Sequence, residues 1–101
     1  MSKDSYLANM EAAFKDASEA TRTTTYKAAV AHLLGYALDF QYNATFDTHL
    51  DGGEDSEGQE IASKFAEECM EVLNTERMQW TEDLVVNFAN AYSEFRKFLE
   101  R

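Results

Sequence analysis

The side chains best suited to chemistry in this sequence are the oxygen and nitrogen ligands of one short segment, residues 47–58. Asp47, His49, Asp51 and Gly52 occupy positions one, three, five and six of the calcium-loop pattern D-x-[DN]-x-[DN]-G-x5-E. Position twelve, where that pattern needs a bidentate Glu, is Gly58. Because the closing ligand is missing, the sequence predicts a solvated acidic loop with no metal or cofactor bound to it.

Groups for nucleophilic or metal-assisted catalysis are sparse. The single cysteine, Cys69, lies at helical spacing from Phe65 and Val72, which predicts a buried thiol. No acidic residue stands three or four positions from His32, so the Glu-x-x-His pair of carboxylate-bridged metal sites is missing. The sequence also contains no G-x-S-x-G, P-loop, G-x-G-x-x-G or HExxH motif. These observations predict a protein that is not an enzyme and has no catalytic residue.

Charge is the strongest signal in the sequence. Nineteen Asp and Glu against nine Lys and Arg give a net charge of −10, which argues against direct binding to nucleic acid or to an anionic membrane. The charge is concentrated in the middle of the chain, because positions 28–71 contain ten acidic residues and one Lys. The acidic residues of this segment are Asp39, Asp47, Asp51, Glu54, Asp55, Glu57, Glu60, Glu67, Glu68 and Glu71.

Most of the chain has the pattern of long helices, which must position these carboxylates. The sequence has no proline, and three of its four glycines lie within residues 52–58. Apolar residues three or four positions apart predict helices over residues 5–20, with Ser5 as the N-cap, and over about 25–43. An acidic, glycine-containing loop at 44–57 is expected to end at the capping box formed by Ser56 and Gln59, where a third helix begins.

The C-terminal half of the chain has two apolar stripes separated by the polar segment NTERMQWTED. Thr75 or Thr81 can cap a fourth helix in this segment, although one continuous helix over 57–99 fits the same pattern. The prediction is a single all-α domain over 1–101, a small antiparallel bundle of four helices, with three helices as the alternative. The residues expected to face the core are Leu7, Met10, Phe14, Ala17, Tyr26, Val30, Leu33, Leu34, Ala37, Leu38, Phe40, Ile61, Phe65, Cys69, Val72, Leu73, Leu84, Phe88, Ala91, Tyr92, Phe95, Phe98 and Leu99.

On the third predicted helix, the glutamates fall opposite the apolar stripe, about 5–6 Å from one another. Such a row of carboxylates resembles the repeat of phosphates along a nucleic-acid strand, although solvation of an outer helix face explains the same pattern. Trp80 lies in the polar segment, where it either packs on the next helix or anchors a protein partner. The predicted partner-binding residues are Asp39, Asp47, Asp51, Glu54, Asp55, Glu57, Glu60, Glu67, Glu68, Glu71 and Trp80.

These features predict a binding protein that acts by occlusion, with its acidic region docked on the basic surface of a nucleic-acid-binding protein. In size, charge and helical content the chain resembles the nucleic-acid mimics and anti-defence inhibitors made by bacteriophages. An alternative is an immunity or antitoxin protein that neutralises a basic nuclease, since residues 55–58 resemble the acidic partner-binding region of such proteins. A third interpretation is a homo-oligomer or small-ligand binder, with Trp80 and the tyrosines at a homodimer interface.

The sequence also indicates a compartment. One cysteine excludes an intramolecular disulfide framework, and no run approaches 18 apolar residues. Asp4 and Glu11 interrupt the apolar stretch that a secretory signal would need. The sequence therefore predicts a cytoplasmic protein, in the host cytoplasm if a phage encodes it, with neither a membrane nor nucleic acid as its direct partner.

Overall fold

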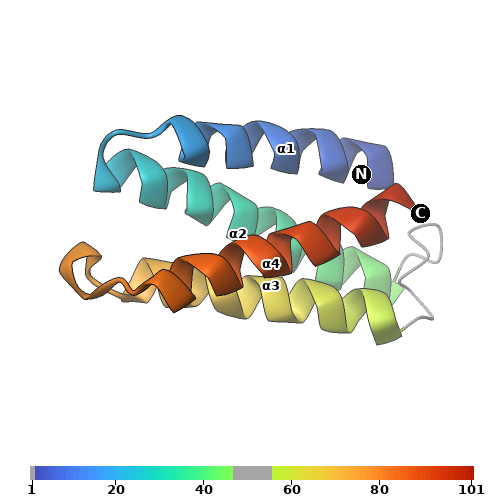
Figure 1. The fold of residues 1–101 in the computed structure, drawn as a ribbon. Helices are drawn as coiled ribbons and strands as arrows, with labels where there is room; N and C mark the ends of the chain where they lie inside the picture. The colour runs from blue at the N-terminus through green and yellow to red at the C-terminus, as the bar shows by residue number, and fades with distance from the viewer. Residues whose placement is uncertain (1, 47–55) are drawn as a thin grey trace.

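The computed structural model describes residues 2–46 and 56–101, which form an antiparallel bundle of four α-helices (Figure 1). The helices are α1 (Lys3–Glu19), α2 (Thr23–Phe46), α3 (Ser56–Asn74) and α4 (Glu82–Glu100), and a short 3-10 helix, η2 (Arg77–Gln79), precedes α4. The predicted all-α fold with four helices is confirmed. The alternative of one continuous helix over 57–99 is wrong, because the chain leaves α-helical geometry between Asn74 and Glu82.

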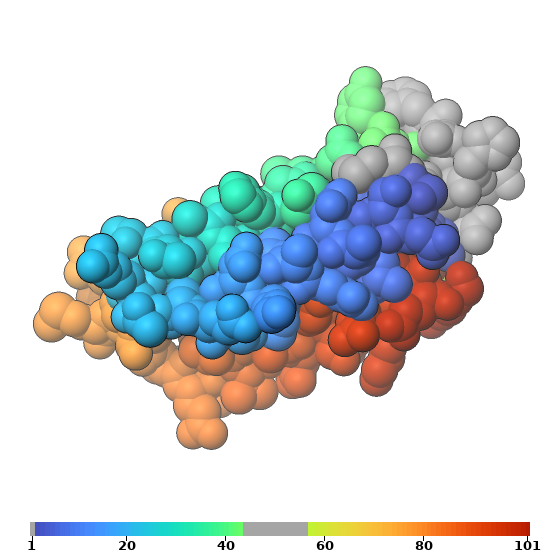
Figure 2. All heavy atoms as spheres, turned by 90° about the horizontal axis from the view of Figure 1, so that it is seen from above, coloured from blue at the N-terminus to red at the C-terminus, as the bar shows by residue number. Residues whose placement is uncertain are grey.

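Each helix packs against its neighbours in the sequence, and α1 also contacts α4, which closes the bundle. The α1–α4 contact is the least extensive of the four. Figure 2 shows α1 (blue) lying over the bundle between α2 and α4. None of the helices in the described part of the chain has the length and apolarity that a bilayer crossing requires.

The first helix begins earlier than expected. Ser2, and not Ser5, is the N-cap of α1, because the Ser2 hydroxyl accepts a hydrogen bond from the backbone N–H of Ser5 at 3.2 Å. The capping chemistry is the predicted one, but two serines stand one helical turn apart and the outer one is used. The N-cap predicted at Thr81 is confirmed, since its side chain accepts from the N–H of Leu84 at 3.2 Å.

The second helix is longer at both ends than the predicted 25–43. It begins at Thr23 and continues to Phe46, so it includes the first three residues of the loop expected at 44–57. Residues 47–55 of that loop lie outside the described residues, as does the side chain of the predicted capping residue Ser56. The third helix begins at Ser56, where the capping box places it.

The core is a stack of aromatic rings along the bundle axis. Phe65 contacts Phe88 and Phe95, with ring centroids 5.8 Å apart in both pairs, and Phe40 lies 5.2 Å from Phe95. Edge and offset contacts of this kind add to the free energy gained from burial. The predicted stripes of α3 and α4 are confirmed, with Phe65, Cys69 and Val72 buried, as are Phe88, Ala91, Tyr92, Phe95, Phe98 and Leu99.

Two core predictions are wrong in detail. On α1 the predicted Met10 and Ala17 are buried, but Tyr6 and Ala13 are buried with them, whereas the predicted Leu7 and Phe14 are only partly buried. On α2, Leu38 was expected to widen the buried stripe but is 48% exposed to solvent. The helix therefore carries an apolar residue on its outer side.

Candidate functional site

The solvent side of α3 carries the strongest concentration of acidic residues in the described part of the chain. We define the acidic ridge as Glu60, Glu67 and Glu71, which are all exposed. The buried side of the same helix is formed by Phe65, Cys69 and Val72, so the ridge points away from the core. Eleven residues separate its two ends, which corresponds to about 16 Å along the helix axis. The prediction that the glutamates fall opposite the apolar stripe is confirmed for these three residues, whereas Glu68 is half-buried.

None of the ridge carboxylates forms an ion pair with another described residue, although Lys64 lies one helical turn from both Glu60 and Glu67. The ion pairs between described residues join Lys15 to Glu19, Arg96 to both Glu11 and Glu100, and Arg101 to Glu57. None of these pairs includes a ridge residue. Lys64 lies on the same face of α3 and is exposed, but it makes no ion pair within 4.0 Å in the described part of the chain. The ridge thus presents an excess of negative charge to solvent.

Two other predicted residues of α3 lie at the edge of the ridge. The carboxylate of Glu57 accepts from the guanidinium of Arg101, 3.1 Å away, and so joins the start of α3 to the end of the chain. Glu68 is half-buried in the groove between α3 and α4, which is also lined by Lys64, Asn87, Asn90 and Glu94. Glu94 adds a carboxylate from α4 that the sequence interpretation missed, and Lys64 adds a positive charge to the same groove.

Asp39 does not belong to this surface. Its Oδ2 atom accepts a hydrogen bond from the hydroxyl of Tyr6 at 2.5 Å and another from the amide of Asn43 at 3.2 Å, while that amide also donates to the Tyr6 hydroxyl at 2.8 Å. These bonds satisfy a phenol whose residue is fully buried. Asp39 thus supports the packing of α1 on α2, and the structure does not bring it together with the ridge.

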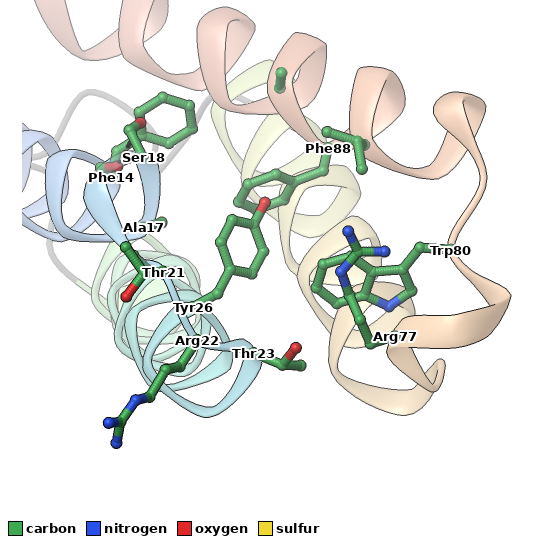
Figure 3. A pocket seen from close by; sticks show the side chains of 13 residues that line it. Phe14, Ala17, Ser18, Thr21, Arg22, Thr23, Tyr26, Arg77, Trp80 and Phe88 are labelled. Carbon is green, nitrogen blue, oxygen red and sulfur yellow. Dashed lines mark hydrogen bonds between the residues drawn. The ribbon is translucent and has the colours of Figure 1, made fainter.

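Trp80 packs on the molecule at the opposite end of the bundle from the chain termini. Its indole N–H donates to the carbonyl of Thr75 at 2.9 Å, and its ring lies 5.3 Å from that of Tyr26. The guanidinium of Arg77 lies over the other side of the indole at 5.0 Å (Figure 3). Trp80 is thus partly buried against the core, with its ring contact on α2, and it lies far along the bundle from Glu60. Its predicted role as an anchor for a partner stays a prediction.

The connection between α3 and α4 is held by a residue that the sequence interpretation did not single out. The Lys27 ammonium on α2 donates to the carbonyls of Leu73 and Thr75, at 3.1 and 3.0 Å. Carbonyls at a helix C-terminus lack intrahelical partners and attract cations. A lone Lys at the start of an apolar helix was the only available signal, and it does not reveal which helix end the ammonium reaches.

A cavity of about 460 Å³ opens between the α1–α2 connection and the start of α4. Phe14, Tyr26, Trp80 and Phe88 contribute rings to its wall. Figure 3 shows Arg22 directed away from these rings and Arg77 stacked on the indole. The rings already contact one another, with Tyr26 and Phe88 6.5 Å apart, so the cavity is the open end of the aromatic core.

The geometry of Cys69 and of the His, Asp and Glu side chains does not indicate nucleophilic catalysis or metal binding in the described part of the chain. Cys69 is fully buried, and burial, with a smaller effect of Glu68, raises the pKa of its thiol to about 12. A thiol of this kind is protonated near neutral pH and is a poor nucleophile. No three His, Cys, Asp or Glu side chains of the described residues come together as a metal site. Asp47, His49, Asp51, Glu54 and Asp55 lie outside the described residues.

Comparison of the chain with protein-family models, with curated proteins and with solved structures gives no significant match in any of the three. The function is therefore argued from the surface itself.

Proposed function

We propose that this protein is a non-catalytic inhibitor whose acidic ridge docks on the basic, nucleic-acid-binding surface of another protein. The observation that carries the proposal is the row of exposed carboxylates on the outer face of α3, Glu60, Glu67 and Glu71, none of which is in an ion pair within the described part of the chain. A groove built to bind phosphates with Lys and Arg binds carboxylates through the same charge-assisted hydrogen bonds. Occupying that groove prevents nucleic acid from entering it.

The helix gives the carboxylates a fixed spacing. Glu67 and Glu71 are four residues apart, which places their Cβ atoms about 5–6 Å from each other. Glu60 lies seven residues before Glu67, about 10 Å along the axis, with Lys64 between them on the same face. The helix α3 is held along its whole length by its buried face. A rigid row of charges loses little conformational entropy when it binds, in contrast to charges on a flexible loop. Glu68 and Glu94 broaden the row towards α4.

An exposed apolar side chain lies beside the carboxylates of the acidic ridge. Met70 lies on α3 between Glu67 and Glu71 in the sequence and is 40% exposed. Charged pairs at an interface mainly raise the association rate and fix orientation, whereas buried apolar or aromatic residues supply most of the affinity. Met70, with its flexible and polarisable side chain, is suited to this second role.

The test is an affinity capture from a bacterial lysate at about 0.1 M and about 1 M salt, because screening differs strongly between these concentrations. Three proteins are compared: the natural chain, a ridge variant (Glu60→Gln, Glu67→Gln and Glu71→Gln) and a matched variant with three other exposed carboxylates neutralised (Asp16→Asn, Glu19→Gln and Glu76→Gln). Both variants lose the same charge, so they separate the position of the charge from its amount.

We expect a basic nucleic-acid-binding protein to be retained at low salt by the natural chain and the matched variant, and to be lost by the ridge variant. Added nucleic acid should compete with it. If the retained protein is one nuclease encoded beside this gene, the inhibitor is of the immunity or antitoxin class; a host nucleic-acid machine indicates the phage anti-defence class. Equal retention by the two variants would refute the ridge as the docking surface.

A further inference from the structure

The outer face of α2 carries little charge, unlike the outer faces of the other helices. The 24 residues of α2 include only two charged side chains, Lys27 and Asp39, and Lys27 is turned towards the end of α3. By contrast, α1 carries four acidic and two basic residues, α3 five and one, and α4 four and two. A helix that has apolar residues on all its sides is usually covered by other elements on all of them.

The apolar outer residues follow a heptad pattern. Ala28, Ala31, Gly35, Leu38 and Tyr42 are spaced by three, four, three and four residues and are all exposed, with Leu38 48% and Tyr42 67% accessible. The inward residues Tyr26, Val30, Leu33, Ala37 and Phe40 form a second such row on the opposite side of the helix. A spacing of this kind is the pattern by which helices pair along a seam. The inner seam is used within the bundle, and the outer seam remains accessible.

Gly35 lies at the middle of the outer seam. A Cβ atom added there would meet nothing within 4 Å, so the glycine is not required by any contact within the described part of the chain. Small residues in such a row allow another helix backbone to approach closely. The outer seam therefore has no side chain at its middle, Gly35. Ala28 and Ala31 precede this position along the helix, and the larger Leu38 and Tyr42 follow it.

The order of these side chains is self-complementary. In an antiparallel pair of α2 helices with a twofold axis near Gly35, Tyr42 of each copy lies against Ala28 of the other, so the largest side chain meets a small one. His32 and Asp39 share one flank of the seam, three residues before and four residues after Gly35, so their distances from its centre differ by only about 1.5 Å along the helix axis. The axis therefore places His32 of one copy near Asp39 of the other, twice.

We propose that the protein forms an antiparallel homodimer through the outer seam of α2, with Gly35 at the twofold axis. A second copy is the partner that fits, because the outer face of α2 carries a single charged side chain, Asp39, and two chains of charge −10 repel each other least where their facing surfaces carry little charge. A single pair of helices of about 36 Å length forms a contact near the lower limit of stable interfaces, about 1,000 Å². The dimer is therefore expected to be concentration-dependent. The seam lies on a different helix from the acidic ridge, so either proposal can fail alone.

Sedimentation velocity over a range of protein concentrations tests the dimer. Leu38→Glu places a carboxylate at the seam of each copy and should raise the dissociation constant at least tenfold. Val86→Glu is the matched control, because Val86 is 44% exposed and lies on α4; it should leave dimerisation unchanged. Circular dichroism confirms that both variants fold. A chain that stays monomeric up to millimolar concentration, or equal dimerisation by the two variants, would overturn the proposal.

Cross-linking tests the direction of the pair. The buried Cys69 does not interfere, so Gly35→Cys and Ala28→Cys each add one accessible thiol. In the antiparallel dimer the thiols introduced at position 35 meet, whereas those at position 28 lie about 21 Å apart along the axis. Mild oxidation should yield a covalent dimer of the Gly35→Cys variant alone. Cross-linking of the Ala28→Cys variant would indicate a parallel pair and would refute the arrangement.

Discussion

The hydroxyl of Tyr6 decides which residues of α1 enter the core. Simple apolar periodicity favours Leu7 over a tyrosine, because a buried phenol must keep its hydrogen bonds. In the structure Asp39 and Asn43 supply these bonds from α2, and Tyr6 is fully buried. Partners 33 and 37 positions away in the chain cannot be recognised from helical spacing, which explains why the sequence predicted Met10 and Ala17 in the core but chose Leu7 in place of Tyr6.

The thiol of Cys69 should make the stability of the protein depend on pH in the alkaline range. Its pKa is about 12 in the folded chain, against an ordinary value of 9.0, chiefly because of burial. Above pH 9 the thiol ionises in the unfolded chain only, so the free energy of unfolding decreases as pH rises towards 12 and is unaffected below pH 9. Between pH 8 and pH 10.5 the expected loss is roughly 2 kcal/mol.

Urea denaturation at these two pH values measures the effect. Cys69→Ala is the control, because it removes the titrating group while leaving Tyr26 and Tyr92, whose pKa values are also raised by burial. The variant should be less stable at pH 8 and should lose less free energy of unfolding between pH 8 and pH 10.5. An identical loss in both proteins would show that the thiol does not contribute.

At the scale of elements, the connection between α3 and α4 depends on Lys27. Its ammonium bonds to the carbonyls of Leu73 and Thr75, and hydrogen bonds to charged groups contribute about 1.5–3 kcal/mol. Lys27→Met keeps the aliphatic stem and removes the donor, so we expect the free energy of unfolding to fall by about 1–3 kcal/mol.

Lys15→Met provides the comparison for this prediction. Lys15 is 74% exposed and pairs with Glu19 only at 4.0 Å, so its replacement should change the free energy of unfolding by less than about 0.5 kcal/mol. Thermal and urea denaturation of both variants measure the difference. A Lys27→Met variant as stable as Lys15→Met would mean that solvent replaces the ammonium at these carbonyls.

The helices themselves were largely predictable, and their ends less so. Local signals such as the Thr81 cap and the 3.6-residue periodicity of α3 and α4 act between residues that are close in the chain, and the structure confirms them. On α2 the sequence chose the inner row correctly, since Val30, Leu33 and Phe40 are fully buried. It misplaced Leu38, because α2 has a second row of apolar residues that helical spacing does not separate from a wide buried stripe. The sequence identified the acidic ridge of α3, which has one apolar face, but missed the outer seam of α2.

At the scale of the whole molecule, the excess negative charge should oppose folding. The protein carries a net charge of −10, and its described ion pairs have side chains 43–74% exposed. Exposed pairs of this kind contribute between zero and about 1 kcal/mol each. Mutual repulsion of the remaining carboxylates, those of the acidic ridge included, is uncompensated in the described part of the chain.

Salt should therefore stabilise the fold, since it screens the repulsion more than it weakens the few pairs. Raising sodium chloride from about 0.01 M to about 0.15 M shortens the screening length from about 30 Å to about 8 Å, and we expect the melting temperature to rise by a few degrees, equivalent to about 1 kcal/mol or less. The variant with Glu60, Glu67 and Glu71 changed to Gln should melt at a higher temperature in low salt and respond less to added salt. A melting temperature that falls with salt would show instead that the ion pairs of Arg96 and Arg101 stabilise the fold more than carboxylate repulsion destabilises it. The repulsion among the ridge carboxylates would then be a minor contribution to the free energy of unfolding.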